Sequence, residues 1–368
     1  MTASPQRFFE TWEAARDAFR AAAAAHPNVG ASGAIDILPG YTLDYAWTGD
    51  ADAARVLVYS SGLHGIEGFV GGAVQCELLG DDDALRPGEG CAVLWLHSLN
   101  PWGMAHGRRV NESNVDLNRN FLPENQAFEA DDAAYARVAG LLNPTRLRRL
   151  DPFYLHVALQ VARHGLPTLR NGIARGQYSQ PNGIFFGGDR HETTTRTLMD
   201  TVLPWLAGRE RVVWIDLHSG RGARGDVVAF VDGAPTAAQG ARAHAAFGDM
   251  LHAWEPGSEL GYEMRGGMLP ELARRYDADR FEALTVEFGT AGDIAIVKAM
   301  RAENWLFHHG PAASRGGRAP ADHPLRQAMR AVFNPADPAW QRGALAHGHD
   351  IHRRALRLLT APAPAVVA

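Results

Sequence analysis

Two short segments carry side chains that could share one metal ion. Residues 63–67 have the sequence Leu-His-Gly-Ile-Glu and offer His64 and Glu67, and residues 215–219, Ile-Asp-Leu-His-Ser, offer His218. Two imidazoles and one carboxylate are a typical set of protein ligands for a catalytic zinc ion, with the fourth position left for water. Zinc in such a site acts as a Lewis acid and lowers the pKa of its water to about 7. If the three side chains converge, the protein is a hydrolase.

Three apolar runs lead to the candidate groups. Residues 55–60 precede the first segment, residues 212–217 lead into His218, and residues 284–288 contain Glu287. Such runs are typical of buried parallel strands, and open α/β sheets place their sites at the carboxyl ends of such strands. Because a Glu in an apolar strand is costly to bury without a purpose, we interpret Glu287 as a general base. The alternative is a structural carboxylate paired with an Arg.

Between the first two runs lies a further set of polar residues. It consists of Asn-Pro-Trp-Gly at 100–103, Gly-Arg-Arg at 107–109 and Asp-Leu-Asn-Arg-Asn-Phe at 116–121. With these motifs the chain resembles the zinc carboxypeptidase superfamily, particularly its aspartoacylase and succinylglutamate desuccinylase-like branch. The motifs occur in the family's order between residues 55 and 290. The stretch 176–183, Gly-Gln-Tyr-Ser-Gln-Pro-Asn-Gly, is similar to a bacterial subgroup of unassigned substrate.

The resemblance implies one zinc ion per chain and a base beside it. It makes His64, Glu67 and His218 the zinc ligands and gives Glu287 the catalytic proton transfer. It also implies the fold: an α/β protein with a doubly wound, mixed and mostly parallel sheet, flanked by helices and carrying a helical insertion.

The resemblance further implies residues that contact the substrate. Asn118 and Arg119 would grip a substrate carboxylate, and Arg109 would polarise the scissile carbonyl. A guanidinium forms bidentate hydrogen bonds with a carboxylate and can stabilise a developing oxyanion. Arg108 is an equally basic neighbour, so the choice of Arg109 depends on its place in the motif.

Two features near the expected site match no motif. The family places a mobile Tyr upstream of the catalytic Glu, and Tyr262 is the candidate for this substrate-binding role, with Tyr276 as the alternative. Either could instead be an ordinary half-buried loop aromatic. Residues 176–188 contain Tyr178, Phe185 and four Gly. Because loops on a rigid scaffold commonly carry substrate contacts, this segment is either a substrate-lining loop or a packing hairpin.

Composition limits the partners and the location. The chain has 368 residues, a net charge of −5 and a pI near 6.3, which argue against nucleic acid or an anionic membrane as a partner. Two cysteines, Cys76 and Cys91, do not make a disulfide framework. The first residues lack a charged-then-apolar signal pattern, and no apolar span is long enough for a membrane. We therefore expect a cytoplasmic protein.

The patterns predict one main domain. Residues 1–310 would form the zinc-carboxypeptidase-like domain with a helical insertion at about 124–207, and residues 311–368 a linker and C-terminal helices packed on it. Predicted strands lie at 42–48, 55–61, 91–97, 212–220, 226–231 and 283–288. Predicted helices lie at 5–26, 69–79, 128–142, 151–164, 191–207, 236–253, 268–275, 292–308, 323–332 and 338–359.

The motifs favour amide hydrolysis but leave the substrate open. One prediction is a metallocarboxypeptidase-like enzyme that cleaves an amide bond next to a carboxylate-bearing leaving group, on a peptide or small molecule with a free carboxylate. The alternative is an N-acyl amino acid deacylase of the aspartoacylase type. A third hypothesis, from another functional class, is a zinc- or ligand-binding protein without catalytic activity. The presence of Glu287 argues against this hypothesis. The sequence does not fix the oligomeric state.

Overall fold

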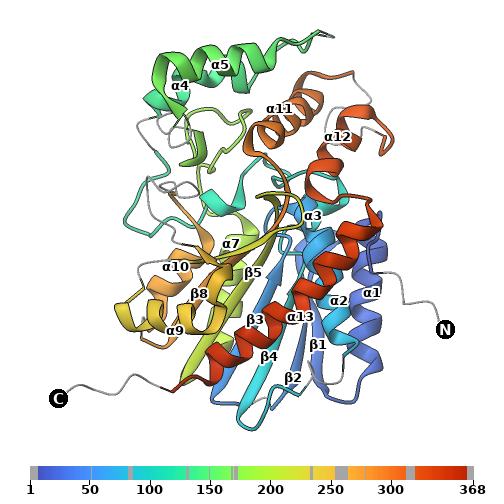
Figure 1. Ribbon diagram of the computed structural model, residues 1–368, viewed down its shortest axis with the longest axis vertical. Helices are drawn as coiled ribbons and strands as arrows, with labels where there is room; N and C mark the ends of the chain where they lie inside the picture. The colour runs from blue at the N-terminus through green and yellow to red at the C-terminus, as the bar shows by residue number, and fades with distance from the viewer. Residues whose placement is uncertain are drawn as a thin grey trace.

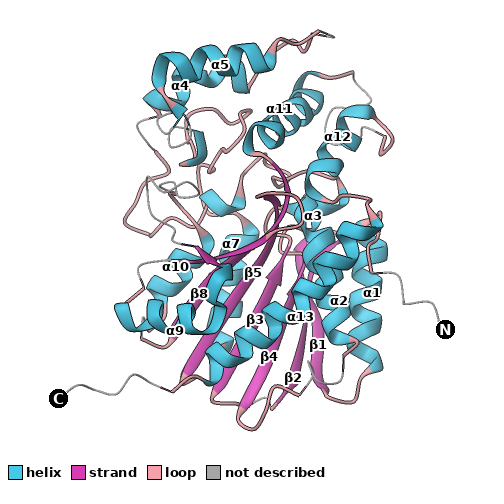
Figure 2. Cartoon of the chain, viewed as in Figure 1, coloured by secondary structure: helices cyan, strands magenta, loops and turns pink. Residues whose placement is uncertain are grey.

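The computed structural model contains one eight-stranded sheet with helices on both faces, as Figures 1 and 2 show. This arrangement confirms the predicted α/β fold class with a mixed sheet. The residues that the structure describes are 7–50, 52–81, 86–129, 132–148, 150–166, 169, 173–232, 235–252, 264–277, 279–311 and 320–362.

The middle of the sheet is parallel and its flanks are mostly antiparallel. Its order is β1-β2-β4-β3-β5-β8-β6-β7. Neighbours among β4, β3, β5 and β8 run parallel, whereas β1, β2 and β6 each pair antiparallel with the strand on their inner side. The strands are β1 (Val29–Leu38), β2 (Tyr41–Gly49), β3 (Arg55–Ser61), β4 (Cys91–His97), β5 (Arg211–Arg221), β6 (Val227–Val231), β7 (Leu251–His252) and β8 (Phe281–Ala291).

The central strands are buried on both faces, which explains their continuous apolar runs. In β3, Leu57 and Tyr59 point into one core cluster, and Val56 and Val58 point into the cluster on the other face. All four side chains have 0 % exposure. The sequence pattern therefore located these strands to within a few residues.

The edge strand β1 was missed by the sequence prediction. It lies outside β2, and most of its residues are exposed or only half buried. Its central stretch, 31–34, is Ala-Ser-Gly-Ala, which has neither an apolar run nor a clear alternation of polar and apolar residues. Pairing with β2 therefore makes this segment a strand, rather than its own propensity.

Two layers of helix cover the sheet (Figure 1). Each layer contributes apolar side chains to one of the two core clusters. The first layer comprises α1 (Trp12–Ala25), α2 (Gly68–Leu79), α9 (Ala237–Phe247) and α13 (Pro338–Thr360). The second comprises α7 (Thr193–Thr197), a π-helical turn (Leu198–Val202), α8 (Leu203–Trp205) and α10 (Met268–Arg275).

Further helices lie above the upper end of the sheet in Figure 1. All of them except the helix Phe153–His164 contribute apolar side chains to a third cluster, which includes Tyr135, Met300 and Phe333. These helices are α3 (Pro101–Ala105), α4 (Ala133–Leu142), α5 (Phe153–His164), α11 (Asp293–His309) and α12 (Pro324–Phe333). The C-terminal α13 crosses the sheet and buries Ile351 and Leu358 in its core. The division of the chain at residue 310 stays a prediction.

The two cysteines lie on α2 and β4. Cys76 and Cys91 are both buried free thiols. Within the described part of the chain, no helix combines the length and apolar character needed to span a membrane.

Candidate metal centre

The predicted site residues lie at the carboxyl ends of three neighbouring parallel strands. His64 follows β3, His218 lies near the end of β5, and Glu287 lies near the end of β8. β4, which follows β3 in the chain, lies on one side of β3 in the sheet. β5, the next strand in the chain, lies on the other side of β3. Such a point, where the strand order reverses, leaves a crevice at the carboxyl ends of the strands in which α/β proteins bind their ligands.

His64, Glu67 and His218 converge with their ligand atoms toward one point. His64 Nδ1 lies 3.0 Å from Glu67 Oε1 and 3.2 Å from His218 Nδ1, and His218 Nδ1 lies 3.0 Å from Glu67 Oε2. One ligand atom from each residue lies within 4.8 Å of the others, and all three residues are buried. Among the described residues, a search for clusters of three or more His, Cys, Asp or Glu side chains that could hold a metal ion gives this group alone.

The far side of each imidazole is occupied by an aspartate. His218 Nε2 lies 2.5 Å from Asp216 Oδ2, and His64 Nε2 lies 3.2 Å from Asp116 Oδ1. Asp216 is itself fixed by the Ser60 hydroxyl, which donates to its Oδ1 at 2.6 Å. An Asp that accepts from Nε2–H leaves the Nδ1 lone pair available for a metal, the usual second-sphere arrangement of metal-binding histidines.

The spacing of the donors suits zinc. Tetrahedral zinc at about 2.0–2.1 Å from each of two nitrogens would hold them roughly 3.3 Å apart. The two Nδ1 atoms are 3.2 Å apart. Two neutral imidazoles and a carboxylate, buried together and oriented from behind, therefore fit a divalent ion of this type.

Glycines in two separate motifs make this convergence possible. A Cβ on Gly65 would lie 2.3 Å from the carbonyl carbon of Gly103, so the backbones of the His-Gly-Ile-Glu and Asn-Pro-Trp-Gly segments meet without side chains between them. Asn100 caps α3 by accepting from the Gly103 N–H at 2.8 Å. The N–H groups of Gly65 and of the next residue donate to the carbonyls of Arg109 and Arg108. Three sequence motifs thus form one packed unit.

Glu287 stands next to His218 across the β5–β8 ladder. Its Oε2 atom is buried and has no hydrogen-bond partner among the described residues. Burial raises the pKa of Glu287 to about 7, and the nearby carboxylate of Glu67 contributes to the rise. Burial also acts on Glu67, but the two imidazoles lower the pKa of that carboxyl below its usual value. Two carboxyls with such different environments suit different roles, one as a ligand and one as a proton carrier.

Arg109 lies at the same site. Its guanidinium forms an ion pair with Asp116, and its Nη2 lies 2.7 Å from His64 Nε2. Its Nε is 3.7 Å from Glu67 Oε1, and its Cζ lies 5.4 Å from the centre of the Phe185 ring. Arg109 also lines the cavity in front of the three ligand residues, so its positive charge faces the space that a substrate would occupy.

Arg108, the alternative to Arg109, points elsewhere. Its Nε donates to Glu303 at 2.8 Å, its Nη2 donates to Asn114 at 3.0 Å, and its Cζ lies 3.6 Å from the centre of the Phe307 ring. These contacts tie the loop to α11. The structure therefore places Arg109 beside the candidate ligands and Arg108 in a buried network behind them.

Asn118 and Arg119 differ in what they face. Asn118 lines the cavity, and its Oδ1 accepts from the Met268 N–H at 3.0 Å. Arg119 is only 1 % exposed and does not contribute to the cavity lining. Its guanidinium donates to the carbonyls of Ala174 and Asn118, and it lies 5.9 Å from the ring centre of Phe185. Arg119 therefore holds the backbone of two cavity-lining residues, Asn118 and Ala174, without facing the cavity itself.

Of the two tyrosine candidates, only Tyr276 lies among the described residues. Tyr262 lies outside the described residues. The hydroxyl of Tyr276 donates to the Leu206 carbonyl at 2.5 Å, and its ring packs against Phe281 with centroids 5.3 Å apart. These contacts explain Tyr276 as a packing residue between α10 and α8.

A cavity of about 610 Å³ opens in front of the candidate metal ligands. The segment 176–188, predicted as either a lining loop or a hairpin, contributes Phe185 to the cavity wall. The same segment forms a bridge between Gln177 and Phe186, and the Tyr178 hydroxyl donates to the Arg119 carbonyl at 2.6 Å. Because the bridge is parallel, the segment is not a β-hairpin, and its contact with a substrate stays a prediction.

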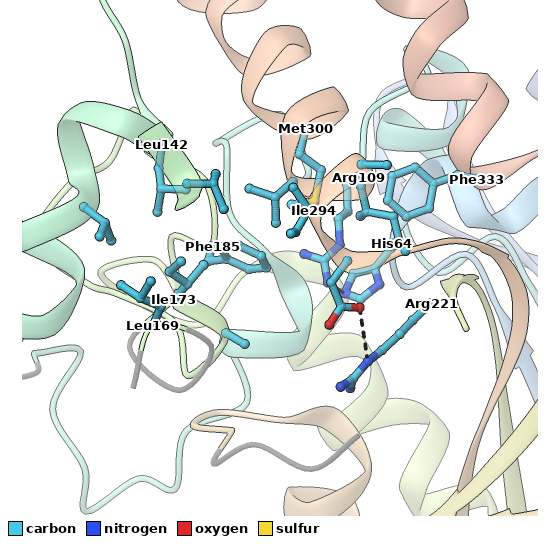
Figure 3. A pocket seen from close by; sticks show the side chains of 18 of the residues that line it. His64, Arg109, Leu142, Leu169, Ile173, Phe185, Arg221, Ile294, Met300 and Phe333 are labelled. Carbon is cyan, nitrogen blue, oxygen red and sulfur yellow. Dashed lines mark hydrogen bonds and ion pairs between the residues drawn. The ribbon is translucent and has the colours of Figure 1, made fainter. Parts of the chain in front are cut away.

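Two charged lining residues belong to no motif. Arg221 lies three residues beyond His218 and forms an ion pair with Asp293, with Nε and Oδ1 3.5 Å apart (Figure 3). The strand β5 continues past His218 to Arg221, so its direction offered a weak signal for this residue. Asp293 begins α11, which no sequence motif linked to the site.

Fold and site together define an α/β protein with a candidate metal centre at the carboxyl edge of its parallel strands. Over residues 8–347 the chain matches the family described as protein of unknown function (DUF2817), and it belongs to that family. No curated protein matches the chain significantly.

Several solved structures share the general arrangement. Bovine thrombin-activatable fibrinolysis inhibitor, in complex with tick carboxypeptidase inhibitor, has 13 % identity over 94 % of this chain and 98 % of its own, with a TM-score of 0.47. Murein-tripeptide amidase from Escherichia coli O157 has 18 % identity over 79 % and 94 %, with a TM-score of 0.39. Succinylglutamate desuccinylase from Chromobacterium violaceum has 14 % identity over 87 % and 74 %, with a TM-score of 0.36.

Proposed function

We propose that this protein is a zinc-dependent hydrolase that cleaves an amide bond next to a carboxylate-bearing leaving group. The observation that carries the proposal is the convergence of His64, Glu67 and His218 within 4.8 Å beside Glu287. The three would hold one zinc ion per chain. When bound, the ion supplies Lewis acidity for an acyl carbonyl and lowers the pKa of water.

The proposed chemistry assigns proton transfer to Glu287. The carboxylate takes a proton from a water molecule in the cavity while the water oxygen adds to the acyl carbon, and it then gives the proton to the leaving nitrogen. The C–N bond breaks, and the products are a carboxylic acid and an amine. Because the Oε2 atom of Glu287 has no partner among the described residues, it can accept this proton without losing an existing hydrogen bond.

Arg109 and Asn118 are proposed to bind the substrate. Arg109 lines the cavity beside His64, where its guanidinium would stabilise negative charge on the carbonyl oxygen. Asn118 lines the same cavity and would contact the carboxylate of the leaving group. The predicted role of Arg119 in gripping that carboxylate requires its guanidinium to leave the Ala174 carbonyl. The role of Arg119 in binding the carboxylate stays a prediction.

A second candidate is the deacylation of an N-acyl amino acid, in which the carboxylate lies on the amino acid product. The apolar wall of the cavity favours it, because Leu142, Phe153 and Ile173 offer space for an acyl group beside a polar end that suits a carboxylate. Both candidates use the same ligands and the same base. They differ in what lies on the acyl side of the scissile bond.

The substitution Glu287→Gln tests the shared mechanism. It removes the proton acceptor but keeps the shape of the side chain, so the variant should bind about one zinc per chain and retain its affinity for substrate. Turnover should fall by at least about 10²-fold, the low end of what a positioned acid–base group contributes. Elemental analysis and steady-state kinetics on N-acyl amino acids and peptides with free C termini measure both.

A matched control lies on the same strand. Glu282→Gln changes a carboxyl at the other end of β8, where it pairs with Arg242, so this variant should keep turnover per folded molecule. Wild-type turnover in Glu287→Gln, or a loss of its zinc, would contradict the proposed role of Glu287.

A further inference from the structure

The cavity in front of the metal centre has two chemically different ends. One end carries the candidate ligands and the charged side chains of Arg109 and Arg221. The other end is walled by aliphatic and aromatic side chains from α4, α5 and the segment that follows α5. We call this second end the apolar chamber and define it by Val138, Leu142, Phe153, Val157, Leu169 and Ile173.

Figure 3 shows the separation of the two ends. Leu142, Leu169 and Ile173 lie on one side of the view and His64 and Arg221 on the other. The Phe185 ring lies between them. A molecule that fills the cavity therefore needs a polar head at the metal centre and an apolar body that passes Phe185.

Two further apolar side chains of the lining are exposed. Leu166 and Ile294 both line the cavity, and they are 46 % and 41 % exposed. Exposed apolar surface of this kind is stabilised when a ligand covers it. Gln160 adds one amide to the chamber wall. The remaining chamber residues offer a substrate contact area rather than hydrogen bonds.

The volume is also larger than the hydrolytic chemistry requires. A volume of about 610 Å³ lies within the range of pockets that enclose a whole drug-sized molecule. An acetyl group beside an amino acid would leave the chamber filled with water, which apolar walls do not favour. A flexible aliphatic chain would fill it.

We propose that the physiological substrate class is the N-acyl amino acids with a long aliphatic acyl chain, and that the chain lies in the apolar chamber. This inference rests on the proposed amide hydrolysis at the metal centre. The scissile C–N bond breaks, the hydroxyl of water goes to the acyl carbon, and a proton goes to the nitrogen. The products are a fatty acid and a free amino acid.

The first test is a series of N-acyl glycines and N-acyl leucines from acetyl to dodecanoyl. Each methylene that enters the chamber should raise kcat/KM by about fourfold, the effect of burying one CH₂ group, until the chamber is full. A kcat/KM that stays flat or falls along the series overturns the inference. C-terminally free peptides provide the comparison: if they are hydrolysed faster than every acyl amino acid, the acyl-chain assignment is wrong and the hydrolase assignment stands.

The second test changes the chamber and keeps the metal centre. Val157→Asp places a carboxylate in the chamber wall, and it should lower kcat/KM for the dodecanoyl substrate by at least about tenfold with little change for the acetyl substrate. Leu159→Asp is the matched control, because Leu159 lies on the same helix, is 57 % exposed and does not line the cavity. It should retain the full chain-length dependence. If Val157→Asp and Leu159→Asp change kcat/KM for the dodecanoyl substrate by the same factor, the inference is overturned.

Two further measurements remain informative if Val157→Asp folds poorly or if no hydrolysis is seen. Val157→Trp fills the chamber without a charge and should shift the preferred acyl chain to a shorter one. Calorimetric binding of N-dodecanoyl glycine and N-acetyl glycine to Glu287→Gln needs no turnover. Tighter binding of the dodecanoyl compound supports the chamber assignment even if the hydrolase proposal fails, and equal binding overturns it.

Discussion

The two ends of the cavity are built from different kinds of structure. At the metal end, side chains come from strand ends and are fixed by buried hydrogen bonds, as Asp216 fixes His218 at 2.5 Å. At the chamber end, side chains come from helices above the sheet and from the segment after α5, and they range from fully buried, as Phe153 is, to half-buried, as Val157 is. Bond-breaking chemistry requires positions held to within about half an ångström, whereas apolar contacts tolerate variation. The fold therefore places the candidate metal ligands at strand ends and the apolar wall of the cavity on helices.

The largest expected effect comes from removing a ligand at the fixed end. His218→Ala takes away one of three donors and leaves Glu67 and Asp216 as buried carboxylates without the imidazole between them. We expect bound zinc to fall from about one per chain to near zero. Activity should be lost together with the metal.

The control for this variant lies on α5, outside the cavity. Leu159→Ala changes α5 outside the lining and should retain full zinc content and activity. Inductively coupled plasma analysis of both purified variants is the measurement. Stoichiometric zinc in His218→Ala would show that the ion binds elsewhere.

A smaller effect is expected from the group behind the ligand. Asp216→Asn keeps the size of the side chain but removes the charge that orients the His218 imidazole. Loss of such a second-sphere partner typically weakens metal affinity by about 10- to 100-fold. Competition with a zinc chelator measures this change directly.

Ser60→Ala tests whether Asp216 acts by orienting the His218 imidazole or through the packing of the strand. It removes the 2.6 Å hydrogen bond from Ser60 to Asp216 but leaves the contact between Asp216 and His218. Its zinc affinity should stay closer to that of the wild-type protein than the affinity of Asp216→Asn. The reverse order would mean that Asp216 acts through the packing of the strand.

The candidate metal centre was predictable from the sequence because its residues occur in motifs at the ends of strongly apolar strands. His64, Glu67, His218 and Glu287 stand where the strand pattern placed them. Asp216 was missed, although a signal was present: two residues before His218 on the same strand, its side chain points to the same face.

Other features depended on contacts that no local pattern contains. The motif favoured Arg109 over Arg108, but it did not show that Arg108 binds Glu303, which lies 195 residues away in the chain. Arg119 carried a family motif, yet its guanidinium faces the Ala174 carbonyl rather than the cavity. Long-range packing determined both outcomes.

For the apolar chamber, the sequence predicted the helices that form it but not the chamber itself. The sequence periodicity gave α4 and α5 to within a few residues, because amphipathic helices have a clear repeat. It did not show that Val138 and Val157 face the same cavity. The relative placement of two helices depends on tertiary packing, so a substrate wall of this type has no sequence motif.

The smallest predicted effect concerns Phe185, the residue between the two ends. Its backbone has a φ of 60°, in the left-handed region, although it carries a large side chain. This conformation costs a non-glycine residue roughly 1–2 kcal/mol. The cost is compensated by the ring, which lines the cavity and lies near the guanidinium of Arg109.

Two substitutions separate the backbone from the ring at this position. Both Phe185→Ala and Phe185→Gly lose the ring, but only glycine relieves the strained backbone, so Phe185→Gly should be the more stable of the two by about 1 kcal/mol. In the helix α5 the order should be opposite, with Val157→Gly less stable than Val157→Ala by about 1 kcal/mol. Urea unfolding of the four variants measures the free energy of unfolding. If Phe185→Gly were the less stable of its pair, the left-handed conformation would not be the native one, and the Phe185 ring could not separate the two ends of the cavity as described.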